Sequence, residues 1–309
     1  MKAMYYCGWD GGGSSTKVFL LPEEGAACQT QGFGPLNPNG STPGAVRQTV
    51  ADCVQWMANQ AGGLKGCGGL VIGIAGVSNL YVAQLLENAV RECGYHGNLR
   101  LLGDQEIALA GAIDGPGAIL IAGTGSICFG RDKAGHTFRA GGFGYLIDDA
   151  GSGYAIGRDI LAAVARASDG RNASTCLTPL VFDALGISDI PSMITWLYSA
   201  ETCKKDVAAL SPLLLEALRR DDPTALRIAR KAADDLSELV LAAWRKNSMQ
   251  GGELALCGSI LTHYPIIRER LSETLRKELP ELSVIPPRRS AAQGAAELAK
   301  AFFHSDNPR

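Results

Sequence analysis

Residues able to hold phosphate stand together near the start of the sequence, between two apolar runs that predict a strand, a tight turn and a second strand. This stretch holds one acid, three glycines and a hydroxyl: Asp10, Gly11, Gly12, Gly13 and Ser14. Glycine has no Cβ, so the backbone can approach a ligand closely and turn through φ > 0. Successive N–H groups in such a turn form an anion site, and Asp10 offers the hard oxygen that Mg²⁺ requires beside phosphate. Taken alone, the stretch is also compatible with a plain hairpin turn.

The same plan recurs later in the chain. There the apolar run 119–122 leads into four turn residues, and a second apolar run follows at once: Gly123, Thr124, Gly125 and Ser126. Two such turns indicate a duplicated unit that grips phosphate, because similar segments far apart in a chain are typical of internal repeats.

Length and composition limit the classes of protein to be considered. The chain has 309 residues, which favours about two domains, and 46% of them are hydrophobic, enough for a substantial core. The net charge of −2 argues against nucleic acid or a membrane surface as partner. The nine cysteines form no C-x-x-C and no zinc-ligand spacing, which predicts reduced thiols and a cytoplasmic location. No apolar run reaches the roughly 18 residues that a membrane helix requires.

The periodicity of apolar residues predicts two halves with the order β-β-β-α-β-α-β-α in the first and β-β-β-α-β-α, with a helical insert over 178–246, in the second. Asp114-Gly115-Pro116-Gly117 is the clearest boundary. We therefore predict domains at 1–115 and 116–289, with the final helix, 290–309, packing back on the first domain.

Some local expectations can be compared directly with a structure. We expect a third strand at 26–31, a helix capped by Ser41 or Thr42, and a later helix that begins after Asn79 with Leu80, Ala83 and Leu86 inward. We also expect a strand over 99–102 and a helix over 105–113, with Asp104 between them.

The order and spacing of seven motifs over nearly the whole chain resemble the N-acetylglucosamine kinase family and the related BadF/BadG/BcrA/BcrD ATPase group of the actin/hexokinase/Hsp70 superfamily. The motifs are Asp10-Gly11-Gly12-Gly13-Ser14, Asn37-Pro38, Asp104, Ala122-Gly123-Thr124-Gly125-Ser126, Arg139-Ala140-Gly141-Gly142-Phe143-Gly144, Gly151-Ser152-Gly153-Tyr154 and Cys257-Gly258-Ser259. The resemblance implies an α/β fold of two duplicated RNase H-like (actin-like ATPase) domains, each a mixed five-stranded sheet flanked by helices, with a cleft between them. It also implies ATP and Mg²⁺ as cofactors, a small-molecule sugar as partner, and a homodimer.

The resemblance assigns roles to particular residues. Asp10 to Ser14 would form the first phosphate loop, with Asp10 binding Mg²⁺ through water, and Gly123 to Ser126 would form the second. Gly258 and Ser259 would contact the adenosine, and Asp104 would be the base on the sugar 6-hydroxyl. The other residues facing the sugar would be Asn37, Gly142, Phe143 and Asp149.

Three departures from the family pattern concern these roles. The family usually has Gly-Asp-Glu-Gly-Ser where this chain has Asp148-Asp149-Ala150-Gly151-Ser152, and Trp where it has Phe143. These two departures touch the sugar side and leave the acceptor identity open. The third, Ser14 in place of Thr, is mild.

Structural interpretations stand beside the functional ones. Asp104 occupies a place typical of a helix N-cap, although phosphoryl transfer also needs a carboxylate to receive the acceptor proton. Asp148 and Asp149 are compatible with a solvated loop, Phe143 with a plug in the core, and Asn37 with an ordinary turn.

The chain is therefore expected to be a kinase that transfers the γ-phosphoryl group of ATP to the 6-hydroxyl of an amino sugar, N-acetylglucosamine or glucosamine. The alternative enzyme is a BadF-type ATPase that activates a 2-hydroxyacyl-CoA dehydratase. A non-catalytic nucleotide or sugar sensor is the third possibility, since one fold hosts many functions.

Overall fold

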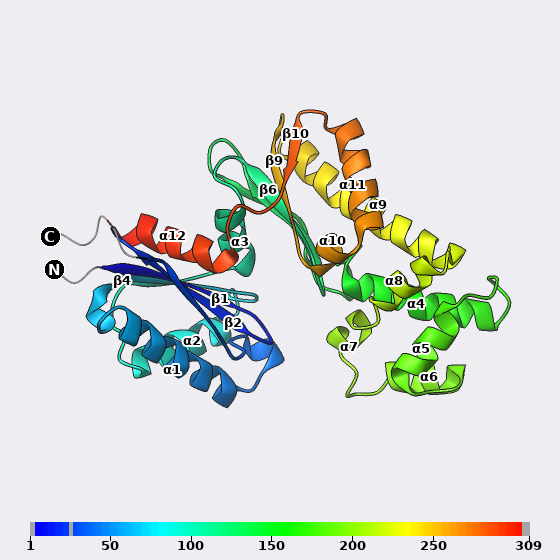
Figure 1. Cartoon of the computed structure of the whole chain (residues 1–309), viewed down its shortest axis with the longest axis horizontal. Helices are drawn as coiled ribbons and strands as arrows, with labels where there is room; N and C mark the ends of the chain where they lie inside the picture. The colour runs from blue at the N-terminus through cyan, green and yellow to red at the C-terminus, as the bar shows by residue number, and fades with distance from the viewer. Residues whose placement is uncertain (1–3, 25–26, 305–309) are drawn as a thin grey trace. The chain divides into compact units, whose positions relative to one another are not determined.

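A computed structural model describes residues 4–24 and 27–304. The chain divides into two compact units (Figure 1). Unit 1 comprises the residues up to Asp114 together with those from Pro287 onward, and unit 2 comprises Gly115–Pro286. The first unit is therefore built from both ends of the chain.

Unit 1 contains a mixed five-stranded sheet of order β3-β2-β1-β4-β5. The central strand β1 pairs antiparallel with β2 and parallel with β4, and β4 pairs parallel with β5. The bounds of these strands are β1 Tyr5–Gly11, β2 Thr16–Pro22, β3 Gln29–Phe33, β4 Cys67–Ile74 and β5 Leu99–Leu102. Every residue of β4 is buried, as expected for a strand with helices on both faces.

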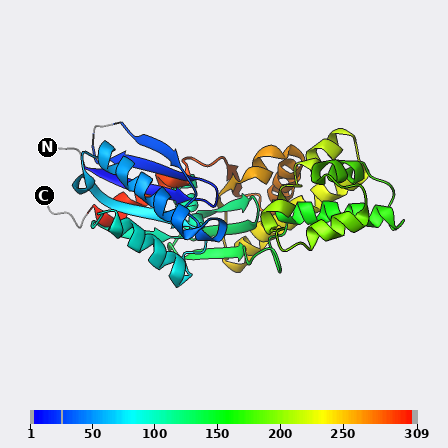
Figure 2. The ribbon, with the colours of Figure 1, turned by 90° about the horizontal axis from the view of Figure 1, so that it is seen from below.

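Two helices lie beside each other on one face of this sheet and two more cover the other face (Figure 1 and Figure 2). The first pair is α1 (Pro43–Gln60) and α2 (Leu80–Glu92), and the second is α3 (Asp104–Ala112) and α12 (Ala291–Phe303). Side chains alternate between the two faces along β1, where Cys7 and Trp9 join the core under α1 and α2 and Tyr6 joins the core under α12.

The contact between α12 and β1 depends on a missing side chain. A Cβ on Gly8 would lie 2.2 Å from the carbonyl oxygen of Ala292 and 2.2 Å from the amide nitrogen of Ala296. These are backbone atoms that a side-chain rotation cannot clear. Gly8 thus lets the last helix of the chain rest directly on the first strand.

Most of the local expectations for unit 1 are met. Thr42 caps α1, its side chain accepting a hydrogen bond from the Ala45 N–H at 3.3 Å. The third strand begins at Gln29 rather than 26, a residue outside those described. The prediction that Leu80 points inward is wrong, because its side chain is 76% exposed at the first position of α2. The inward face of that helix begins at Val82, where the chain has turned toward the sheet.

Unit 2 contains the second mixed five-stranded sheet, of order β10-β9-β6-β7-β8. The pairing repeats that of unit 1: the central strand β6 is antiparallel to β7 and parallel to β9. The strands are β6 Gly117–Ala122, β7 Ser126–Arg131, β8 Thr137–Gly141, β9 Gly252–Cys257 and β10 Leu282–Ile285.

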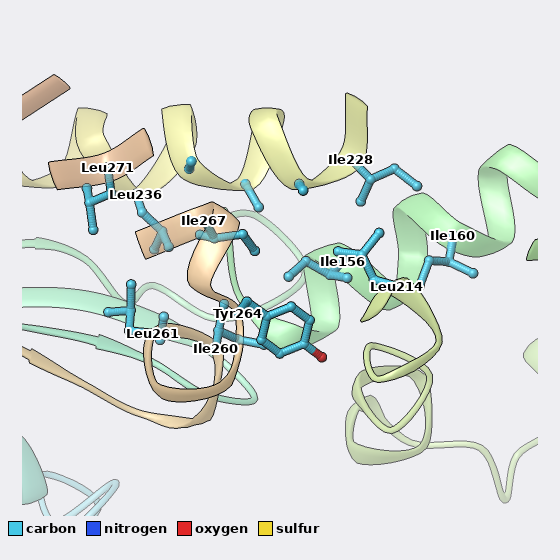
Figure 3. Close-up of a cluster of buried hydrophobic side chains, with 14 of the residues drawn as sticks. Ile156, Ile160, Leu214, Ile228, Leu236, Ile260, Leu261, Tyr264, Ile267 and Leu271 are labelled. Carbon is cyan, nitrogen blue, oxygen red and sulfur yellow. The ribbon is translucent and has the colours of Figure 1, made fainter. Parts of the chain in front are cut away.

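The helices of unit 2 enclose one continuous hydrophobic core (Figure 3). The helical segment that follows β9 is interrupted at Tyr264, because Pro265 begins a new helix there. The helices are α4 Gly153–Ser168, α5 Leu177–Leu185, α6 Ile190–Leu197, α7 Lys204–Ala208, α8 Leu213–Arg219, α9 Pro223–Lys246, α10 Ser259–His263 and α11 Pro265–Glu278. Short 3₁₀ turns at Pro38–Gly40 and Leu64–Gly66, both in unit 1, complete the elements of the described residues.

Within the described residues, no single helix is both long and apolar enough to cross a membrane. The helices α5 and α6 meet the length and composition criteria only as a pair, bent by 57°. Both contribute side chains to the core of unit 2, including Leu177, Val181 and Met193.

Candidate functional site

The first glycine-rich turn joins β1 to β2. The Gly12 N–H donates to the Ser15 carbonyl oxygen at 3.0 Å and closes the turn. A Cβ on Gly12 would lie 2.7 Å from that oxygen, so the close backbone approach expected from the sequence is present. The expectation of positive φ is wrong, because none of Gly11, Gly12 and Gly13 adopts it. The short distance to the Ser15 carbonyl oxygen, rather than a left-handed backbone conformation, accounts for the glycine at position 12.

The two turns share a chemical feature, which is backbone N–H groups without an acceptor. In the part of the chain that the structure describes, the N–H groups of Gly13 and Ser14 in the first turn have no hydrogen-bond partner. The same holds for Thr124 and Gly125 in the second. Adjacent free N–H groups in a turn are suited to binding an anion such as phosphate.

Asn37 is held beside the first turn by backbone contacts. The Gly12 carbonyl oxygen accepts hydrogen bonds from the Leu36 N–H at 3.1 Å and from the Asn37 N–H at 3.2 Å. The Asn37 side chain donates to the Ala75 carbonyl oxygen, which lies just beyond β4, at 3.2 Å. Asn37 is therefore buried and fixed between the ends of two strands.

Asp104 stands at the junction of β5 and α3. The cap residue is Gly103, and Asp104 is the first residue of the helix, so the alternative that Asp104 is the N-cap is wrong. Its Oδ1 accepts a local hydrogen bond from the Gln105 N–H at 3.0 Å. Asp104 thus carries a carboxylate at the carboxyl end of a parallel strand, where open α/β sheets place their ligands.

The sequence interpretation missed Glu106, which fixes the backbone before Asp104. Its carboxylate accepts a hydrogen bond from the Gly103 N–H at 2.7 Å. The available signal was a Glu three residues after a helix cap, the spacing at which Glu reaches back to the cap N–H.

Asp10 and Asp104 interact electrostatically. Burial raises the pKa of Asp10 above its usual value, the negative charge of Asp104 raises it further, and Lys17 opposes both. Burial also raises the pKa of Asp104, while hydrogen bonds from the Gln105 and Asp104 N–H groups oppose the shift. Two carboxylates of raised pKa at one edge of a sheet form the type of arrangement that occurs at functional sites.

The second turn, between β6 and β7, is held by the start of α4. The Gly153 N–H donates to the Gly123 carbonyl oxygen at 2.7 Å, and the Tyr154 N–H donates to the Thr124 carbonyl oxygen at 3.3 Å. As in the first turn, Gly123 and Gly125 do not adopt positive φ.

The side chain of Asp149 packs against this second turn. It is 5% exposed, which excludes the solvated-loop interpretation for this residue. Its Oδ1 accepts from the Ser126 N–H at 3.4 Å, and a Cβ on Gly125 would lie 2.8 Å from its Oδ2. Burial raises the pKa of Asp149, and the hydrogen bond from Ser126 opposes the shift. Its φ of 60° is unusual for a residue with a side chain and typical of functional segments.

Phe143 lies on the loop that follows β8. Its side chain is 64% exposed, so the interpretation of Phe143 as a core plug is wrong. The flanking Gly142 and Gly144 adopt φ values of 73° and 96°, which explains why glycines surround the ring. Asp148, which has no role in the family resemblance, accepts a hydrogen bond from the Phe143 N–H at 3.0 Å.

Gly258 sits where β9 ends, directly beside the second turn. It caps α10 with φ 94°, and a Cβ there would lie 2.3 Å from the carbonyl oxygen of Ala122, the last residue of β6. The following Ser259 is exposed. Unit 2 therefore brings together the second turn, Asp149 and Gly258, whereas unit 1 brings together the first turn, Asn37 and Asp104.

Two similar sheets, each with a phosphate-type turn between its central strand and the next, define a nucleotide-binding protein of the actin-like ATPase and sugar kinase fold. The chain belongs to the BadF/BadG/BcrA/BcrD ATPase family, whose model matches residues 7–299. The resemblance inferred from the motifs and the fold class are both confirmed.

Three relatives illustrate the likeness. An N-acetylmuramic acid/N-acetylglucosamine kinase of Clostridium acetobutylicum is 31% identical over 300 residues, which cover 96% of this chain and 98% of that protein. The glucosamine kinase GspK of Vibrio cholerae is 27% identical, with 96% and 95% covered. A solved structure from Chromobacterium violaceum, provisionally described as an N-acetylglucosamine kinase, superposes with a TM-score of 0.78 at 27% identity, covering 97% of this chain and all of that one.

Proposed function

We propose that this protein is an ATP-dependent kinase that transfers the γ-phosphoryl group of Mg·ATP to the 6-hydroxyl of an amino sugar, N-acetylglucosamine or glucosamine. One observation carries the proposal. Unit 1 gathers a turn with free N–H groups and two carboxylates of raised pKa at the carboxyl edge of its sheet. That edge belongs to a chain similar over 96% of its length to proteins named as amino-sugar kinases.

The glycine-rich turns would bind the phosphates of ATP. Gly11, Gly12, Gly13 and Ser14 would form the first loop and Gly123 to Ser126 the second. Gly258 and Ser259, which follow the strand next to the second loop, would contact the adenosine. A Cβ on Gly123 would meet no protein atom within 4 Å, so the space beside this residue is open to a ligand.

Mg²⁺ would be held by Asp10 through water. Asp10 is the penultimate residue of β1, which leads directly into the first turn with its free N–H groups. A single carboxylate together with phosphate oxygens and water is a donor set that suits Mg²⁺. When bound, the ion would neutralise phosphate charge, which is the main requirement of phosphoryl transfer.

Asp104 would act as the general base that receives the proton of the 6-hydroxyl as the bond to phosphorus forms. Asp104 does not cap the helix, and its local hydrogen bond from the Gln105 N–H involves Oδ1. Oδ2 takes no part in that hydrogen bond. Asp149 is a poorer base because it is buried against the second turn and accepts the Ser126 N–H.

The acceptor would be oriented by Asn37, Gly142, Phe143 and Asp149. Asn37 is fixed beside the first turn, and Phe143 presents an exposed ring. The name of the Clostridium relative adds N-acetylmuramic acid to the acceptors worth testing.

An ADP-release screen tests the proposal. The purified protein is supplied with Mg·ATP and, separately, glucosamine, N-acetylglucosamine, N-acetylmannosamine, N-acetylmuramic acid, glucose or no sugar. We expect ADP release that depends on one of the amino sugars and a product phosphorylated at the 6-position by mass spectrometry and NMR.

ADP release that is equally fast without sugar would instead support the BadF-type ATPase, and an iron–sulfur chromophore would strengthen that alternative. Binding of ATP or sugar without ADP release would support the sensor.

We further infer a cytoplasmic homodimer. All nine cysteines are free thiols, as is typical of a reducing compartment. Light scattering coupled to size-exclusion chromatography would test the dimer, and a mass of one chain would contradict it.

A further inference from the structure

One peptide bond of unit 2 is held at both of its polar ends by charged side chains. The guanidinium Nη2 of Arg139 donates to the Gly142 carbonyl oxygen at 3.0 Å. The N–H of the same peptide group, which belongs to Phe143, donates to Oδ2 of Asp148 at 3.0 Å. A cation on the oxygen and an anion on the N–H stabilise one orientation of the peptide plane, and hydrogen bonds to charged groups are the stronger kind.

Arg139 also contacts the aromatic ring that this peptide carries. The guanidinium carbon lies 4.3 Å from the centroid of the Phe143 ring, within cation–π distance. The ring nevertheless remains 64% exposed. An exposed aromatic side chain normally samples several rotamers, so the contact with Arg139 gives this ring a preferred position.

Asp148 closes the loop from its other end. Its backbone N–H donates to the Gly144 carbonyl oxygen at 2.8 Å, while its side chain receives the Phe143 N–H. The glycines within the loop adopt left-handed φ values and restrict the backbone little by themselves. The two charged side chains therefore contribute directly to the order of the loop around Phe143.

We propose that Arg139 and Asp148 are positioning residues that hold Phe143 as a fixed stacking surface for the apolar face of the acceptor sugar. This inference rests on the proposed function and assigns a role to Asp148. Asp148 acts as a hydrogen-bond acceptor for the loop and does not contact the sugar or the metal ion.

The kinetic test distinguishes two properties of Asp148, its ability to accept a hydrogen bond and its negative charge. Asp148→Ala removes the acceptor for the Phe143 N–H and is expected to raise the KM for the amino sugar about 3- to 10-fold, as loss of one such hydrogen bond predicts. The KM for ATP should stay unchanged. Asp148→Asn keeps an oxygen acceptor and should restore the sugar KM to within about 2-fold of the wild type. An Asn variant as impaired as the Ala variant would overturn the proposal in favour of direct contact by the carboxylate.

A double-mutant cycle tests whether Arg139 and Asp148 act on the same peptide group. Arg139→Ala should raise the sugar KM like Asp148→Ala, and the double variant should be less impaired than the product of the two single effects, because the residues share a partner. Lys133→Ala, an exposed cation in the turn between β7 and β8, is the matched control and should behave as wild type. Independent, multiplicative effects would contradict a shared role.

Hydrogen exchange gives a readout that does not need activity. The Phe143 amide should exchange slowly in the wild type, and about 10-fold faster or more in Asp148→Ala, because exchange requires the hydrogen bond to open. Fast exchange of this amide in the wild type would overturn the proposal that Asp148 holds the Phe143 peptide. If the wild type phosphorylates no sugar but protects the amide, the proposed function fails, whereas the positioning of the Phe143 peptide by Asp148 is supported.

Discussion

Burial and, next to it, the negative charge of Asp104 raise the pKa of Asp10, although Asp10 lies in β1 and Asp104 follows β5. The strand between them is β4, in which Gly73 pairs with Asp10 on one side and with Leu102 on the other. A Cβ on Gly73 would lie 2.1 Å from Cδ1 of Ile107. Glycine at this point therefore allows α3 to pack closely on β4 and brings Asp104, its first residue, near Asp10.

Replacement of the proposed base should separate catalysis from nucleotide binding. Asp104→Asn keeps the shape and the hydrogen bond from the Gln105 N–H but removes proton acceptance. We expect kcat to fall about 10²-fold or more, in line with general-base contributions, with ATP binding by calorimetry nearly unchanged. Asp10→Asn should instead weaken the use of Mg·ATP. Retention of more than about a tenth of the wild-type kcat by Asp104→Asn is incompatible with the base role, and Asp149 would then be tested next.

The same substitution should stabilise the fold near neutral pH. Because the pKa of Asp104 is raised on folding, the folded state binds its proton more tightly than the unfolded chain does. Ionisation therefore costs stability as the pH rises from the ordinary value of about 3.9 through the folded-state pKa. Asp104→Asn should have a higher Tm than the wild type at pH 7, and the gain should vanish below about pH 3.5. The exposed Asp52→Asn serves as control, and an equal gain there would show an unrelated cause.

Gly123 offers a test of the second phosphate loop that leaves the protein structure undisturbed. Its φ is not left-handed and a Cβ there meets no protein atom within 4 Å, so the fold itself does not require glycine. Gly123→Ala should keep the wild-type Tm and raise the KM for ATP, because only a bound phosphate would meet the new methyl group. Gly32→Ala, another position with open space and ordinary φ, should change neither quantity. Unchanged ATP kinetics in Gly123→Ala would remove the main support for a phosphate at this residue.

Asp222 should make the stability of the helical insert depend on pH. Its side chain accepts four hydrogen bonds, from the Thr224 and Ala225 N–H groups at the start of α9 and from the Thr175 hydroxyl and the Cys176 N–H before α5. Burial alone would raise its pKa, but hydrogen bonds, led by those from the Ala225 and Cys176 N–H groups, hold the pKa below its usual value.

Asp222→Ala should therefore lower the free energy of unfolding by about 1–2 kcal/mol, the range for loss of a helix cap. A depressed pKa stabilises the fold above the ordinary value of about 3.9, and this contribution is lost as the pH falls through the folded-state pKa. Denaturant titrations of both proteins should thus show a difference that is constant at neutral pH and smaller below about pH 3.9. A difference that grows in acid would contradict the proposed hydrogen bonds to the ionised carboxylate.

The sequence alone determined the elements of this protein and the class to which it belongs. The repeated order of apolar strand, glycine turn and apolar strand predicted two sheets of the same plan, because strand and helix periodicity depend on near neighbours in the chain. The spacing of the turns, Asp104 and Gly258 indicated the family that the comparison confirmed. Local stereochemistry was less reliable: the glycines of the first turn were expected to turn through positive φ, and none of them does.

Only the tertiary structure decided which residues act on one another. The electrostatic interaction of Asp104 with Asp10 depends on the strand order, in which β4 lies between β1 and β5. No local sequence pattern encodes this strand pairing. In the same way, the exposure of Phe143 and its hydrogen bond to Asp148 follow from the path of a loop rather than from residue type. Such contacts join residues from separate elements, and their geometry is fixed by the packing of whole helices and strands. A sequence can therefore predict which side chains have the chemistry for binding or catalysis, whereas the fold determines which residues they interact with.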